Sequence, residues 1–61
     1  MNLDYFKKEV PKATERQIHN AFIAFESAIY PAGYELDMGE FEEFIIEKSA
    51  EIVEFLKKLV A

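Results

Sequence analysis

The helix predicted over residues 38–60 carries an apolar surface that is too wide for one neighbouring helix to cover. Its start is marked by Asp37 and Glu40, which form the pattern of a capping box. One row of apolar residues follows the three-four spacing of a helix face: Met38, Phe41, Ile45, Ile52, Phe55 and Leu59. A second row repeats every seven residues: Ile46, Val53 and Val60. Together the two rows span about 200° of the helix circumference, so a single partner helix cannot bury both.

A second long helix is predicted over about residues 15–30. Thr14 is a good N-cap, and Gln17 three residues later completes another capping box. The apolar residues of this helix fall within about 100° of arc and form one core-facing stripe: Ile18, Ala21, Phe22, Phe25, Ala28 and Ile29. A Pro-Ala-Gly turn signal at residues 31–33 separates this helix from the next one. The two long helices are therefore expected to form an antiparallel hairpin.

A short N-terminal helix is predicted over about residues 2–10. Asn2 is its expected N-cap, and Pro11 interrupts it because proline disfavours helix at the preceding residue. A helix of this length is marginal in isolation, so it must dock on the rest of the chain. The sequence therefore predicts an all-α fold in one small domain over residues 1–61.

These helices leave part of the apolar surface to be covered. The helix over 38–60 is expected to be about 34 Å long, and the one over 15–30 only about 24 Å. Either the short N-terminal helix crosses the open side, or two chains pair. A chain of 61 residues without cysteine buries a small share of its surface and often gains stability by oligomerising. We expect a homodimeric helical bundle.

The charge of the chain narrows the classes of partner. The net charge is −5 at pH 7, and residues 17–61 hold nine acidic and three basic groups. This balance argues against direct binding to nucleic acid or to an anionic membrane surface. No apolar run approaches the roughly 20 residues of a membrane span, and residues 1–10 lack the pattern of a signal peptide. A cytoplasmic location is expected.

His19 is the single histidine, and it lies at helical spacing with Ile23, Glu26 and Tyr30. This stripe is either part of a site, or a partly exposed surface or subunit contact, and the second interpretation is favoured. One histidine without cysteine gives no transition-metal site, and no phosphate-binding or nucleophile motif is present. We therefore expect no catalysis, cofactor or metal. The residues predicted at an interface are His19, Ile23, Tyr30, Ile46, Val53 and Val60.

Five glutamates form a predicted acidic ridge along the helix over 38–60: Glu40, Glu43, Glu47, Glu51 and Glu54. Like charges four residues apart on a helix repel each other by a few tenths of a kcal/mol. Such a ridge either meets a basic partner or is a solvated face that keeps the protein soluble. The solvated face is the favoured interpretation.

Residues 21–25 and 36–44 together resemble an EF-hand, with an aromatic entering helix, a loop, and an exit helix that opens with Glu-Phe. The acidic ligands of the ordinary twelve-residue loop are absent. The resemblance is to the fourteen-residue variant, which implies calcium ligation by four backbone carbonyls and by the carboxylate of Glu40. The carbonyls would be those of Ser27, Tyr30, Ala32 and Glu35. The chain departs from that family at Pro31 and lacks a second, pairing hand.

The sequence favours a small acidic protein–protein interaction module with a regulatory or adaptor role and no catalysis. Its partners are expected to be a second copy of itself and another protein, which the acidic charge suggests is basic. One alternative is an inhibitor of phage or mobile-element type that mimics nucleic acid and occupies a basic protein. Another is a purely structural self-assembling bundle, and a remote one is a degenerate EF-hand-like helix-loop-helix.

Overall fold

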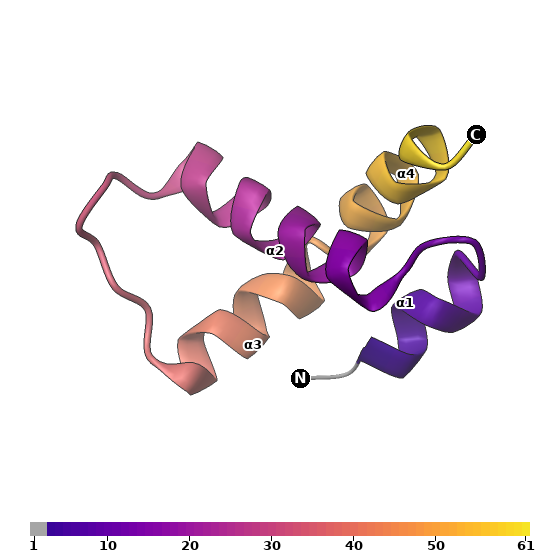
Figure 1. The fold of residues 1–61 in the computed structure, drawn as a ribbon. Helices are drawn as coiled ribbons and strands as arrows, with labels where there is room; N and C mark the ends of the chain where they lie inside the picture. The colour runs from indigo at the N-terminus through magenta and orange to yellow at the C-terminus, as the bar shows by residue number, and fades with distance from the viewer. Residues whose placement is uncertain (1–2) are drawn as a thin grey trace.

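The computed structural model describes residues 3–61, which form α-helices and no strand. The helices in chain order are α1 (Leu3–Glu9), α2 (Glu15–Ile29), α3 (Met38–Glu47) and α4 (Ser49–Leu59). Figure 1 shows α2 running across the middle of the molecule, with α1 and α4 at the end where α2 begins. The predicted all-α class is confirmed. The predicted N-cap Asn2 lies outside the described residues.

Two helix starts are fixed by the capping boxes that the sequence predicts. The Thr14 hydroxyl accepts the Gln17 backbone N–H at 3.1 Å, and the Thr14 N–H donates to the Gln17 side chain at 2.9 Å. The Asp37 carboxylate accepts the Glu40 backbone N–H at 2.8 Å, and the Glu40 carboxylate accepts the Asp37 backbone N–H at 3.1 Å. Each box satisfies donors that a helix start otherwise leaves unpaired. Both predictions are confirmed.

The Asp37 cap gives a first testable prediction. Asp37→Ala removes the acceptor for the Glu40 N–H and should lower the free energy of unfolding by about 1 kcal/mol. Glu43→Ala is the matched control, because Glu43 is an exposed acid on the same helix and its loss should change stability by less than about 0.5 kcal/mol. Urea unfolding followed by circular dichroism measures both. Equal losses in the two variants would contradict a capping role for Asp37.

The core lies where α1, the first half of α2, and parts of α3 and α4 meet. Phe22 of α2 is fully buried, and its ring lies 5.1 Å from that of Phe6 and 6.4 Å from that of Phe41. The buried residues are Phe6, Val10, Ala13, Ile18, Ala21, Phe22, Phe44, Ile45, Ile52, Val53 and Leu56. Phe6 and Val10 show that the N-terminal segment docks on the long helices. The sequence left two ways to cover the wide apolar surface: docking of the N-terminal helix or pairing of two chains. The first is present, because α1 packs on the core of its own chain.

The prediction of one continuous helix over 38–60 is wrong, because the structure has two helices there, α3 and α4, with a break at Lys48. This residue has φ −96° and ψ 7°, which interrupts the helical backbone between α3 and α4. A uniform helix would point Ile46 and Val53 in nearly the same direction, yet Ile46 is 72% exposed and Val53 only 6%. The break turns the second apolar row inward along α4. As a consequence, α2 packs against α4, and α3 diverges from α2 towards the loop at 30–37 (Figure 1).

Candidate protein-binding surfaces

Apolar side chains reach the surface on two helices that touch each other: Phe25 and Ile29 of α2, and Phe55 and Leu59 of α4. We call these four residues the α2–α4 surface. The Phe25 and Phe55 rings meet edge to face at a centroid distance of 5.8 Å, which joins the two helices. Ile29 and Leu59 each lie four residues beyond one of these rings, about one turn further along its own helix. Phe25 is half-buried, and Ile29, Phe55 and Leu59 are 50%, 41% and 50% exposed.

Phe25 and Ile29 belong to the same stripe of α2 as two core residues. Ile18 and Phe22, in the first half of that stripe, are fully buried. The second half is not, because α3 diverges from α2 there (Figure 1). The predicted core stripe is therefore correct for Ile18, Ala21 and Phe22, whereas Phe25 is half-buried and Ala28 and Ile29 are exposed.

The predicted interface residues do not gather on one surface. His19 and Ile23 are exposed on α2, and Tyr30 is half-buried with its ring 5.6 Å from that of Phe44. Val53 lies in the core and Val60 packs against it, so neither requires a second chain for its burial. Ile46 alone of the second row is exposed.

The five predicted ridge glutamates are all exposed, but the break at Lys48 divides them between two helices. Glu40 is engaged in capping α3, and Glu54 lies 3.9 Å from the ammonium group of Lys57. The ridge is therefore not one continuous row. Within residues 3–61, no group of three or more acidic or histidine side chains is placed to hold a metal ion.

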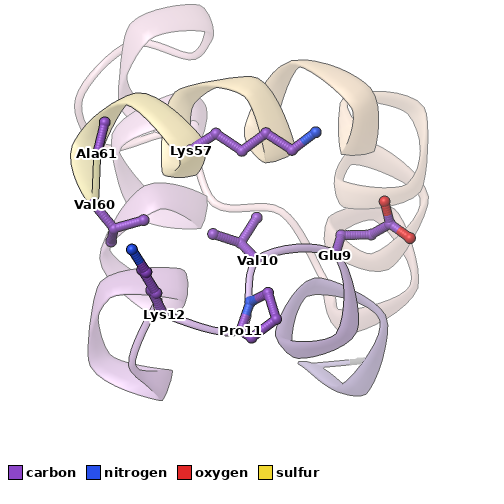
Figure 2. Close-up of a pocket in the computed structure, with 7 residues that line it drawn as sticks. All are labelled: Glu9, Val10, Pro11, Lys12, Lys57, Val60 and Ala61. Carbon is purple, nitrogen blue, oxygen red and sulfur yellow. The ribbon is translucent and has the colours of Figure 1, made fainter.

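A cavity of about 350 Å³ separates the turn after α1 from the end of α4 (Figure 2). Its apolar lining comes from Val10, Pro11, Val60 and Ala61. Lys12 extends toward Val60 in the close-up, while Lys57 and Glu9 lie at the rim. The charged groups of this cavity are therefore the ends of long side chains. Specific ligand sites instead hold their polar groups at fixed positions among apolar ones.

A second cavity, of about 240 Å³, lies beside the loop that follows α2. The turn at its edge is closed by the Tyr34 N–H, which donates to the Pro31 carbonyl at 3.1 Å. Gly33 has φ +88° in this turn, a value that suits glycine and is typical of a type II turn at that position. The turn brings Tyr34 back onto Tyr30, and the two rings stack at 5.1 Å with an interplanar angle of 17°.

Sequence reasoning identified part of these features and missed others. Tyr30 was predicted at an interface, but Tyr34 was not, although both flank the turn signal at 31–33. Phe25 and Ile29 were assigned to the core face, and Phe55 to the first apolar row. Tyrosines on both sides of a Pro-Ala-Gly turn are the signal from which the stacked pair could have been predicted.

Comparison with known proteins identifies no relative: no protein-family profile, curated protein or solved structure matches the chain. None of the helices in residues 3–61 is both long enough and apolar enough to cross a membrane. We therefore infer the function from the surfaces described above.

Proposed function

We propose that this chain is a protein–protein interaction module without catalytic activity, and that it acts as a homodimer paired through the α2–α4 surface. The observation that carries the proposal is that Ile29, Phe55 and Leu59 are exposed on the two helices that the Phe25–Phe55 ring contact joins. Exposed apolar patches mark interaction sites in soluble proteins. Covering them would complete a helical bundle.

The accessible surface of the chain also supports pairing. It amounts to 4444 Å², whereas a compact monomer of 7.1 kDa is expected to expose about 4,100 Å². The surplus is modest, and it agrees with helices that do not close over one another completely. A chain this small gains proportionally more from burying such surface than a large one does.

The charges beside Phe55 favour a second copy as the occupant. Glu51 precedes Phe55 by four residues and Lys58 follows it by three, which places both on one flank of α4, where both are exposed. A two-fold axis near Phe55 with the two α4 helices antiparallel would bring Lys58 of each copy opposite Glu51 of the other. An isologous interface requires such self-complementarity.

Sedimentation equilibrium over micromolar to millimolar concentrations tests the proposal. The wild-type protein should approach twice its 7.1 kDa mass as concentration rises. Leu59→Glu should weaken association at least about tenfold, because it places a charge in an apolar contact. Met38→Ser is the matched control, since Met38 is an exposed apolar residue on α3, outside the α2–α4 surface. A wild-type protein that stays monomeric, or equal weakening by both variants, would overturn the proposed interface.

A further inference from the structure

The cavity beside the loop after α2 combines a carboxylate with two aromatic rings. Glu26, Ser27, Tyr30 and Tyr34 contribute to its lining. Glu26 is half-buried, and no basic group of residues 3–61 forms an ion pair with it. Tyr30 covers one face of the Tyr34 ring, and Tyr34 remains 52% exposed. The cavity therefore offers negative charge and an accessible aromatic surface within a volume of about 240 Å³.

These groups together match the chemistry of a cation. The face of a tyrosine ring is electronegative and attracts ammonium or guanidinium groups. A carboxylate beside it accepts their N–H donors in charge-assisted hydrogen bonds. Arginine fits both features best, because its planar guanidinium stacks on an aromatic ring while its edge donates to a carboxylate. The volume lies below the usual range for small-molecule sites of about 300–1,000 Å³, which favours one inserted side chain.

We propose that the Glu26–Tyr30–Tyr34 pocket receives an arginine side chain from a basic segment of a partner protein. This inference rests on the proposed function as an interaction module and names the chemistry of the partner. The charge distribution supports it, since residues 17–61 hold nine acidic groups against three basic ones and attract a basic partner. The α2–α4 surface pairs two copies, and the pocket binds the partner.

The pocket is tested by NMR titration of the full chain with the peptide acetyl-Gly-Arg-Gly-amide. Saturable amide shifts should concentrate at residues 26–34. The control peptide carries citrulline, which has the shape of arginine without its charge, and it should produce no saturable shifts. If both peptides bind equally, or if the shifts spread over all acidic side chains of the protein, the proposal is overturned.

Variants distinguish binding of arginine in the pocket from general electrostatic attraction of the peptide to an acidic protein. Glu26→Gln and Tyr34→Ala should each weaken binding of the arginine peptide by about threefold or more, since each removes one of the two interactions. Glu43→Gln removes the same charge from an exposed site on α3 and should leave the affinity within about twofold, because exposed charges contribute little. Equal weakening by Glu26→Gln and Glu43→Gln would show nonspecific charge attraction and overturn the proposal.

The same samples distinguish this inference from the dimer. If arginine fails to bind a protein that sediments as a dimer, the pocket proposal falls and the α2–α4 interface stands. If arginine binds at residues 26–34 of a protein that stays monomeric, the interface proposal falls and the pocket stands.

Discussion

Phe22→Ala is expected to leave little folded protein at room temperature. Phe22 is fully buried, and its ring contacts Phe6 of α1 and Phe41 of α3, so its removal opens a cavity between three helices. Truncation of a buried phenylalanine costs about 3–5 kcal/mol. A protein of 61 residues has a total stability of about 3–9 kcal/mol at typical per-residue values. The loss is therefore comparable with the whole free energy of folding.

Tyr5→Ala is the matched control for this effect. The Tyr5 ring lies 5.1 Å from that of Phe6, the same centroid distance that separates Phe6 from Phe22, and both pairs are edge to face. Tyr5 is exposed, so its truncation should cost only about 1 kcal/mol. Chemical denaturation at matched protein concentration measures both variants. If both variants lost a similar amount of unfolding free energy, ring contact and not burial would determine the contribution of Phe22 to stability.

The parts of the fold that were predicted correctly depend on interactions between residues close in sequence. Each capping box joins residues three positions apart, so Thr14 with Gln17 and Asp37 with Glu40 specify their helix starts without reference to the rest of the chain. The core stripe of α2 follows in the same way from helical spacing. These features are local, and a single sequence contains them.

The break at Lys48 could not be predicted, because no local signal marks it. Residues 40–60 contain neither proline nor glycine, and their apolar spacing fits a continuous helix. The bend arises from packing: α4 places Ile52, Val53 and Leu56 in the core shared with α1 and α2. Such contacts join residues far apart in the sequence.

The candidate surfaces depend on the same distant contacts. The exposed second half of the α2 stripe depends on the divergence of α3 from α2, which follows from the bend and from the loop at 30–37. The stacking of Tyr30 with Tyr34 depends on a turn that the sequence does signal. The conformation of that turn, with Gly33 at φ +88°, is what sets the two rings together.

The bend itself is tested by Val53→Asn and Ile46→Asn. A continuous helix would place the two residues on one face, and the two substitutions would then have similar effects. In the bent chain Val53→Asn buries an amide among apolar side chains, which should cost about 3–5 kcal/mol through lost apolar burial and an unpaired polar group. Ile46→Asn exchanges an exposed side chain and should cost less than about 1 kcal/mol.

Denaturation at several protein concentrations makes the comparison decisive. Val53→Asn should be destabilised at every concentration, because Val53 is covered within its own chain. Ile46→Asn should unfold like the wild-type protein at low and high concentration alike, since Ile46 lies outside the α2–α4 surface. A loss of stability in Ile46→Asn that grows with concentration would place Ile46 beneath a second chain. The second apolar row would then take part in the dimer, and the interface would have to be moved from α2 and α4 toward α3.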